Sequence, residues 1–364
     1  MKEHSMSSAG RPAAANRPEW TIGLDLGDRW SQYCVLDAGG EVVEEGRVAT
    51  TGKGLSGLGG GRGRCRVALE TGTHSPWVSR LVERLGHEVV VAHARQVRLI
   101  AESSRKDDRM DARTLARLAR VDPALLNPVR HRSAEAQLDL TLVRGRAALV
   151  EARTALINSA RGLAKSYGER LPKCGSGRMG PEVAGRLSPE LQQALGPMLA
   201  AVRGLTEQIR DCDRRMERLG RERYPELGRL TQVPGVGVLT ALTYVLTMED
   251  AGRCRKSREA GCVFGLQPKR RDSGQSRPQL GITKEGDAYV RQLLVECAQH
   301  ILGPFGRDCQ LRRWGLELAR RGGRGAKRKA LVAVARKLAV LLHRLWVSGE
   351  KWEPWPQGEP VEAA

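Results

Sequence analysis

The sequence of 364 residues contains no Cys-x-x-Cys pair, few aromatic residues and no long uncharged apolar run. A zinc ribbon is therefore not expected, and Cys297 and His300, a lone Cys-x-x-His pair, are expected to be ordinary helix residues. Aromatic residues make up only 4%, which does not indicate base stacking on single strands. Because an apolar segment typical of signal peptides or membrane spans is missing, we expect a cytoplasmic protein with reduced thiols.

The sequence also contains fewer acidic than basic residues. The chain has 41 Asp and Glu against 61 Lys and Arg, which gives a formal net charge of +20. Solubility requires only a few units of charge. A strongly basic surface attracts polyanions and binds phosphate backbones by releasing counterions. This charge favours a nucleic-acid partner over a membrane surface, because no amphipathic helix with a Trp- and Phe-rich face stands out.

The N-terminal part alternates between strand and helix signals after a polar tail, residues 1–19, which is expected to be disordered. Apolar alternation and tight turns predict an antiparallel meander of three strands at residues 20–26, 30–36 and 41–49. A Gly-rich stretch, residues 51–64, is expected to be a loop. It precedes a strand at 65–69, a helix at 77–85, a buried parallel strand at 89–92, and helical signals near Val97 and across 110–118. This order predicts an α/β domain with a mixed sheet over residues 20–125.

Long helical patterns dominate the remainder of the chain. Residues 134–167 and 189–219 have helical apolar spacing, and Gly and Pro mark a break at 171–181. This pattern predicts a helical hairpin or coiled-coil arm within residues 126–222. A mainly helical C-terminal domain is expected over residues 223–348, with helices at 284–302 and 325–345 and a short tail at 349–364.

Four acidic residues stand where an α/β sheet could bring them together. Asp25 lies on the first strand just before a turn, Glu70 ends the fourth, and Asp108 and Asp111 lie three residues apart at the start of a predicted helix. That spacing puts both carboxylates on one helix face, and neighbouring strand ends open into a common crevice. Taken singly, each acid also fits turn chemistry, compensation of the helix dipole, or pairing with Arg105, Arg109 or Arg113.

Converging carboxylates repel one another unless cations neutralise them. Mg²⁺ suits such oxygen-only sites, and two such ions can clamp the attacking and leaving oxygens of a phosphoryl transfer. The set of four acids therefore predicts a magnesium centre for phosphoryl transfer.

The segments that carry these acids resemble a known family. Gly-Leu-Asp at 23–25, Leu-Glu at 69–70 and Lys-Asp-Asp-Arg-Met-Asp at 106–111 are similar to the RuvC-like domain of DEDD insertion-sequence transposases, which include the Piv pilin-inverting recombinases. The resemblance implies an RNase H-like (RuvC-like) fold with metal ligands at Asp25, Glu70, Asp108 and Asp111. Asp107 is the alternative to Asp108.

The C-terminal motifs resemble the same family. They are Gly-Leu-Gln-Pro at 265–268, Asp-Ser-Gly at 272–274 and Gly-Ile-Thr-Lys-Glu-Gly-Asp at 281–287. The resemblance implies that Ser273, with Ser276 as the alternative, attacks DNA and becomes covalently linked to it. A serine needs a base or a metal to activate it, and no His lies nearby in the sequence. Basic residues of this loop could stabilise the phosphoryl charge, and they are Lys269, Arg270, Arg271, Arg277 and Lys284.

Two further basic or Gly-hinged segments admit two interpretations each. Val-Pro-Gly-Val-Gly at 233–237 resembles a helix–hairpin–helix turn, in which the backbone N–H groups of Gly235 and Gly237 would hold a DNA phosphate, but it also fits an ordinary helix connection. The basic run at 312–344 fits either a solvated helix face or a contact with a DNA or RNA backbone.

The resemblance covers residues 20–302 and implies cut-and-join chemistry: metal-assisted attack by Ser273, a covalent serine–DNA intermediate and strand exchange. It also implies donor and target DNA as substrates, a structured noncoding guide RNA, and homodimers or tetramers. Two alternatives remain at this level. One is a RuvC-like junction nuclease without serine chemistry, and the other is a non-enzymatic nucleic-acid-binding protein.

Overall fold

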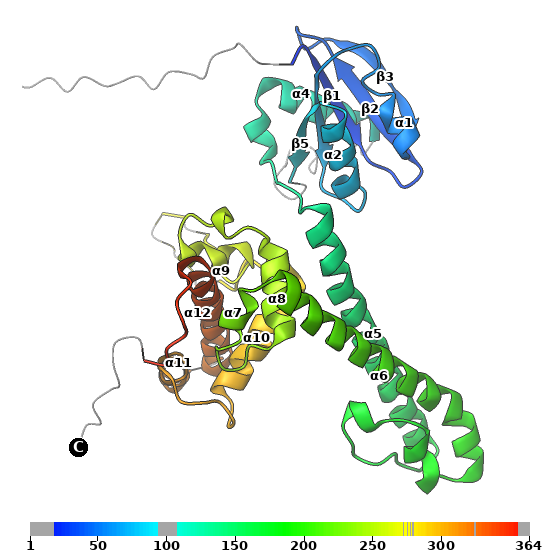
Figure 1. Cartoon of the computed structure of the whole chain (residues 1–364), viewed down its shortest axis with the longest axis vertical. Coiled ribbons are helices and arrows are strands. Elements are labelled where there is room, and N and C mark those ends of the chain that lie inside the picture. The colour runs from blue at the N-terminus through cyan, green and yellow to red at the C-terminus, as the bar shows by residue number, and fades with distance from the viewer. Residues whose placement is uncertain are drawn as a thin grey trace, which may run out of the picture. The chain divides into compact units, whose positions relative to one another are not determined.

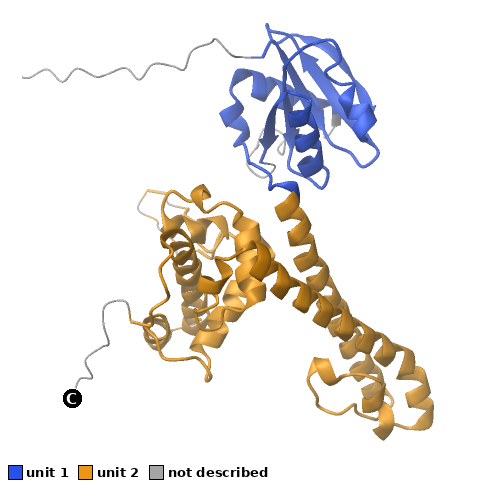
Figure 2. Cartoon of the chain, viewed as in Figure 1, with its two compact units in different colours: residues 1–134 blue, residues 135–364 orange. Residues whose placement is uncertain are grey.

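The computed structural model describes residues 18–93 and 108–355, apart from residues 272, 275, 277, 279 and 324 and the side chain of Asp108. The chain divides into two compact units, residues 1–134 and 135–364 (Figures 1 and 2). The expectations for the tail before residue 18, the helix near Val97, Asp107, Arg277 and the carboxylate of Asp108 lie outside the described residues.

Unit 1 is built on a five-stranded mixed sheet in the order β3-β2-β1-β4-β5 (Figure 1). Its first three strands, β1 (Trp20–Asp25), β2 (Trp30–Leu36) and β3 (Val42–Ala49), form the predicted antiparallel meander. Strand β4 (Cys65–Glu70) lies parallel to β1, and β5 (Glu88–Ala92) lies parallel to β4. The predictions of a mixed sheet and of a buried parallel strand at 89–92 are confirmed.

Helices cover both faces of this sheet, which gives unit 1 three layers. Helix α2 (Ser75–Arg84) buries Val78 and Val82 against Ile22 and other apolar residues on one face. Helix α4 (Asp108–Val121) packs on the opposite face and is followed by a short 3₁₀ helix, η2 (Pro123–Leu126). Strand residues with even numbers on β1 therefore face α2, and those with odd numbers face α4.

The Gly-rich segment after β3 differs from its prediction. It contains a short helix, α1 (Gly52–Ser56), where a loop was expected. The hydroxyl of Thr51 caps this helix by accepting a hydrogen bond from the Gly54 amide at 3.1 Å. Leu55 is buried in the core beneath α2. One cap and one apolar anchor therefore outweigh the low helix propensity of glycine over a single turn.

Unit 2 begins with two long antiparallel helices, α5 (Ala134–Ser166) and α6 (Pro189–Arg223), as predicted for a helical hairpin (Figure 1). Polar contacts join them along their length. They link Arg223 with Asp139, Arg146 with Asp213, and Arg153 with Thr206. The connection between the helices contains two 3₁₀ helices, η3 (Ser176–Arg178) and η4 (Pro181–Arg186).

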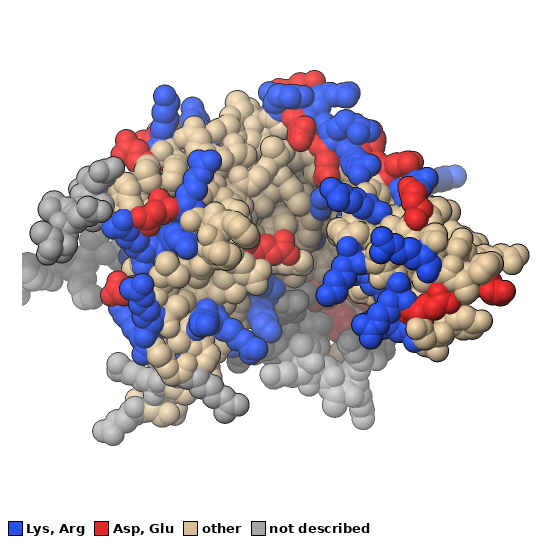
Figure 3. Space-filling view, turned by 90° about the horizontal axis from the view of Figure 1, so that it is seen from below, with Lys and Arg blue, Asp and Glu red and all other residues tan. Residues whose placement is uncertain are grey.

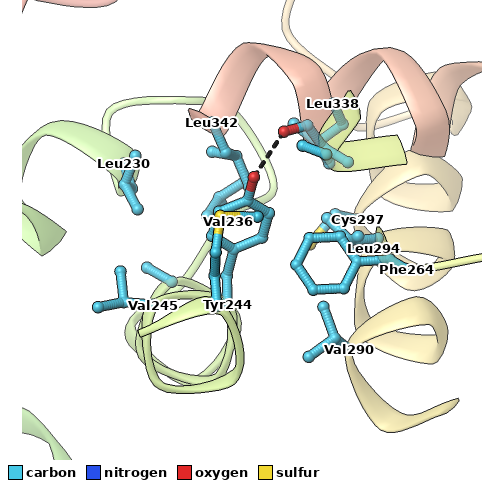
Figure 4. Close-up of a cluster of buried hydrophobic side chains, with 14 of the residues drawn as sticks. Leu230, Val236, Tyr244, Val245, Phe264, Val290, Leu294, Cys297, Leu338 and Leu342 are labelled. Atoms are coloured by element: carbon cyan, nitrogen blue, oxygen red, sulfur yellow. Dashed lines mark hydrogen bonds between the residues drawn. The ribbon is translucent and has the colours of Figure 1, made fainter. Parts of the chain in front are cut away.

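The rest of unit 2 is a helical domain around one large core. Its short helical segments are α7 (Leu227–Leu230), η5 (Ala251–Arg253), η6 (Ser257–Glu259) and α9 (Ala260–Val263). Its main helices are α8 (Val238–Met248), α10 (Ala288–Leu302), α11 (Gln310–Arg320) and α12 (Ala326–Ser348). Tyr244 of α8 lies at the centre of the core, where its hydroxyl donates to the Ala339 carbonyl at 2.7 Å (Figure 4).

The predicted start of one helix in this domain was wrong. Helix α10 starts at Ala288, four residues later than predicted, because Lys284 and Gly286 have positive φ angles of 59° and 71°. The carboxylate of Asp287 then caps the helix by accepting hydrogen bonds from the amides of Tyr289 and Val290.

Within the part of the chain that the structure describes, every helix is too short or too polar to cross a membrane.

Candidate active site

Asp25 and Glu70 lie side by side at one edge of the sheet of unit 1. Strands β1 and β4 are parallel and pair in register as far as Leu24 and Leu69. Asp25 and Glu70 are the next residue of each strand, so their backbones are about 5 Å apart at the spacing of neighbouring strands. Both residues are partly buried. The register therefore brings together two carboxylates that are 45 residues apart in the sequence.

Both side chains point to the face covered by α4. Gly23 and Asp25 are two residues apart and share a face, as do Ala68 and Glu70. Gly23 touches α4: a methyl group added there would lie 1.9 Å from the Ala112 carbonyl oxygen. Ala68 packs with apolar residues of the same helix. Small residues thus let α4 approach closely beneath the strand ends that carry the two acids.

Helix α4 runs antiparallel to β1, so its N-terminal end lies at the edge that carries Asp25. Its start touches Gly23 through Ala112, whereas Arg120 near its end donates to the Pro18 carbonyl at 2.7 Å, just before β1 begins. Asp111 directly precedes Ala112 and is partly buried. Asp25, Glu70 and the start of α4, which carries Asp111 and the backbone of Asp108, therefore lie at the same edge of the sheet.

Polar contacts fasten α4 over the sheet. The guanidinium of Arg113 donates two hydrogen bonds of 2.7 Å to the carboxylate of Glu45 on β3. This contact lowers the pKa of Glu45. On the other side of the helix, Arg66 of β4 donates to the Ala119 carbonyl at 3.0 Å. Both contacts hold α4 against the sheet.

The donor set fits a hard divalent cation, because it consists of carboxylate oxygens alone. Among the described residues, no group of three or more His, Cys, Asp or Glu side chains is arranged to hold a metal ion. The carboxylate of Asp108 lies outside that set. Asp25, Glu70 and Asp111 all have polar partners within the chain.

A histidine that the sequence interpretation did not single out lies at the same edge. Loops after β1 and β4 meet where Nε2 of His74 lies 3.6 Å from Oδ1 of Asp28. Nδ1 of His74 accepts a hydrogen bond of 3.0 Å from Nε1 of Trp77, so the proton of the neutral ring resides on Nε2. The sequence signal that could have pointed to His74 is its position three residues before Trp77 at the start of a helix.

In unit 2, the loop that carries Ser273 spans residues 265–286 and is called the serine loop. Its two ends are held in close contact. Gly265 and Gly286 have positive φ angles and let two backbone segments touch. A methyl group at Gly265 would lie 2.2 Å from the Glu285 carbonyl oxygen, and one at Gly286 would lie 2.0 Å from that of Val263. Arg291 of α10 joins the segments by donating to the carbonyls of Phe264 and Glu285, both at 3.0 Å.

Ser273 lies at the tip of this loop. The strands of the loop pair at Pro268 and Ile282, and again at Ser273 and Ser276. The Ser276 amide donates to the Ser273 carbonyl at 2.9 Å, and Gly274 turns the chain with a φ of 54°. Residues opposite one another in an antiparallel pair share a face, so the hydroxyls of Ser273 and Ser276 are presented on the same side. Both residues are exposed.

Basic residues lie along the same loop. Lys269, Arg270, Arg271 and Lys284 are exposed and form no ion pair with any described residue. More widely, Lys and Arg cover more of the face seen in Figure 3 than Asp and Glu do. The loop therefore presents a serine hydroxyl within a positive field, which suits approach to a phosphodiester.

The Gly-hinged turn at 233–237 connects α7 to α8. Gly235 has a φ of 82°, and a methyl group there would lie 3.0 Å from the ring of His300 on α10. Packing against α10 thus accounts for this glycine. Gly237 precedes α8 in open space and leaves the start of that helix without a side-chain cap.

The cysteines form no disulfide, and the basic run lies on two helices. All eight thiols are free, and Cys297 is buried within α10 with its thiol 3.5 Å from the Thr240 hydroxyl. Burial raises the pKa of this thiol. The prediction that Cys297 and His300 are ordinary helix residues agrees with their packing. The basic run occupies α11 and α12, where Lys327, Arg328 and Lys329 are exposed.

Both halves of the chain match known transposase families. Residues 22–168 match the family described as "Transposase" with the DEDD signature, and residues 227–308 match "Transposase IS116/IS110/IS902 family". The first match contains Asp25, Glu70 and Asp111, and the second contains Ser273.

Several curated proteins are similar over most of the chain. The transposase for insertion sequence element IS1111A of Coxiella burnetii is 27% identical over 97% of this chain and 96% of its own length. The transposase for insertion sequence element IS1328 of Yersinia enterocolitica is 30% identical, covering 65% of this chain and 70% of its own. A putative transposase of Sinorhizobium fredii, y4pF/y4sB, is 31% identical over 79% and 74%, respectively.

Proposed function

The chain belongs to the IS110 family of insertion-sequence transposases, and from this premise we propose that it cuts and rejoins DNA through a covalent serine intermediate. The matched transposase domain implies an RNase H-like fold, with which the five-stranded mixed sheet of unit 1 agrees. The observation that supports the proposal is that Asp25, Glu70 and the start of α4, which carries Asp111, lie at one edge of that sheet.

In the proposed reaction, Oγ of Ser273 attacks the phosphorus of a DNA phosphodiester. A new Oγ–P bond forms, the bond from phosphorus to one deoxyribose oxygen breaks, and the serine proton is released while the leaving oxygen takes up a proton. A hydroxyl of another DNA end then attacks the seryl phosphodiester and releases the serine. The number of phosphodiester bonds stays constant, so strand exchange needs no energy-rich cofactor.

Asp25, Glu70, Asp108 and Asp111 would hold Mg²⁺. When bound, the metal would polarise the phosphoryl oxygens and stabilise the charge that develops on them. The carboxylates would hold the cation and would not contact the phosphodiester directly, because bare carboxylates repel a phosphate. Lys269, Arg270 and Arg271 contribute by attracting the phosphate backbone of DNA to the serine loop. The acids and the serine act on the same phosphodiester within one chain or between two copies.

The proposal extends to three further partners. The basic charge of +20 supports binding of donor and target DNA and of a structured guide RNA. Gly235 and Gly237, together with Lys284, would hold phosphates without reading sequence. Assembly into dimers or tetramers would bring two serine loops to one pair of DNA strands.

The test is strand cleavage of a DNA duplex that contains the insertion-sequence end, measured with Mg²⁺ and the guide RNA present. Ser273→Ala and Asp25→Asn are expected to abolish cleavage, whereas Ser276→Ala, the matched control on the same loop, is expected to retain it. Cleavage that survives Ser273→Ala but not Asp25→Asn would indicate a junction nuclease without serine chemistry. Activity unchanged by Asp25→Asn would exclude the acidic centre.

A further inference from the structure

The far end of the α5–α6 arm is a separately built structure with its own small core. Ile157, Ala160 and Ala164 of α5 pack there against Leu195, Leu199 and Val202 of α6. The connection between the helices folds over them and buries Leu171, Met179 and Leu187. Each helix spans about 50 Å at 1.5 Å per residue, so this end of the arm is remote from the core around Tyr244. The folded connection is more than is needed to join two helices.

A cavity of about 470 Å³ opens on this end of the arm, and basic residues dominate its wall. Arg161 and Lys165 come from the last turns of α5. Arg170 and Lys173 come from the connection, and Leu171, Pro172 and Cys174 complete the lining. The cavity wall contains no acidic residue. Four positive charges thus face one hollow that is large enough for a segment of sugar–phosphate backbone.

Acidic residues within the described chain do not neutralise these charges. None of the four cations forms an ion pair with a described residue. The nearest acid in the sequence, Glu169, is engaged elsewhere, since its carboxylate accepts a hydrogen bond of 2.8 Å from the Ser188 amide. Neighbouring like charges repel one another, so an anion in the cavity would be attracted by all four.

A purely structural role explains part of this cluster. Cations in the last turns of a helix compensate its dipole, which accounts for Lys165, and Arg161 supports the connection by donating to the Cys174 carbonyl at 3.2 Å. Arg170 and Lys173 lie beyond the end of α5 and make no such contact. Their direction into the same cavity is left without a structural reason.

We propose that this cavity, at the tip of the arm, is a second binding site for the phosphate backbone of DNA, separate from the acidic centre and the serine loop. The inference rests on the proposed function only in taking DNA as the polyanion. Lysine and arginine contacts to phosphates carry no sequence information, so the site adds affinity and fixes how the DNA is held.

The experiment compares the full chain with a triple variant, Lys165→Gln, Arg170→Gln and Lys173→Gln, which leaves the supporting Arg161 in place. Binding of a fluorescein-labelled DNA duplex is measured by anisotropy over a series of salt concentrations. Loss of three phosphate contacts is expected to lower the slope of log affinity against log salt by about two to three. Affinity at moderate salt is expected to fall by at least about ten-fold.

A matched control removes three exposed cations elsewhere on the arm, by Arg214→Gln, Arg215→Gln and Arg218→Gln. This variant has the same net charge and is expected to keep most of the salt dependence. A second variant, Lys165→Arg, Arg170→Lys and Lys173→Arg, keeps the charge at the cavity and is expected to bind like the unaltered chain. If this second variant also loses binding, the residues are needed for folding and not for their charge, and the proposal fails.

Equal losses in the cavity variant and the Arg214 control variant would show that only overall charge matters and would overturn the proposal. Unchanged DNA binding in the cavity variant would also overturn the proposal. If the cavity variant binds DNA normally but binds a labelled RNA duplex more weakly, the cavity belongs to RNA. The assay is independent of catalysis, because it measures binding alone and requires no strand cleavage. Failure of the serine chemistry therefore leaves this test intact.

Discussion

Gly23 is the residue that determines how closely α4 can approach β1. The carbonyl of Ala112 and the amide of Ala116 occupy the space that any side chain at residue 23 would need. Because Asp25 and Asp111 flank this contact in the sequence, the distance between two proposed ligands depends on the missing Cβ. The absence of a side chain at residue 23 therefore affects both the packing of α4 and the separation of the proposed ligands.

Replacing Gly23 with alanine is expected to push α4 outward. Overpacking of this kind costs about 1–3 kcal/mol of stability, and a displacement of about 1 Å at a reactive centre lowers rates by about a hundred-fold. The measurements are chemical denaturation and strand cleavage. Gly52→Ala in α1 is the control, because a methyl group there meets no atom within 4 Å, and it is expected to behave like the unaltered chain. Full cleavage activity in Gly23→Ala would contradict the close contact.

At the scale of elements, two glycines join the strands of the serine loop at its base. Gly265 and Gly286 allow the backbone contacts that Arg291 then secures from α10. The loop can therefore present Ser273 at a defined place even though its tip is exposed. The same arrangement explains why α10 begins only at Ala288.

Gly286→Ala is expected to open the base of the loop, because its φ is 71° and the Val263 carbonyl lies 2.0 Å from the added methyl group. Strand cleavage should fall at least about ten-fold, while the stability of unit 1 stays unchanged. Gly281→Ala on the same loop meets no atom within 4 Å and serves as the control. Equal activity of the two variants would show that the base does not position the serine.

The contact between α4 and β3 has a pH dependence with a definite sign. The Arg113 guanidinium lowers the pKa of Glu45 below its ordinary value of 4.5. The ionised form is thus favoured in the folded state, so the stabilisation is fully present above pH 4.5 and is lost as the pH falls through the lowered value. Denaturation midpoints of the unaltered chain and Glu45→Gln should differ at neutral pH and converge in acid. A difference that grows in acid would contradict this linkage.

Periodicity in the sequence predicted most elements but not how they meet. Alternating apolar residues predicted the strands of the meander, and helical apolar spacing predicted the helices of the arm, because both patterns are local. The helix α1 and the late start of α10 depended on a hydroxyl cap, a buried leucine and two positive φ angles, which apolar periodicity does not register. The convergence of Asp25 with Glu70 depended on strand order and register, and Gly23 became informative only once α4 lay against it.

At the scale of the whole molecule, the two units divide the proposed chemistry between them. Unit 1 carries the acids, and unit 2 carries the serine loop and the arm. The order of the motifs predicted this division, but no local signal in the sequence relates the serine to acids that precede it by more than 160 residues. The charge of +20 gives all these parts one common partner, a polyanion.

The most direct test of the central claim is to trap the covalent protein–DNA adduct and identify its attachment point by mass spectrometry of the digested complex. A suicide DNA duplex, nicked so that the released strand diffuses away, prevents religation. We predict a nucleotide phosphate attached to the peptide that contains Ser273, absent from Ser273→Ala and from Asp25→Asn. An adduct on another residue, or cleavage without any adduct, would contradict the account.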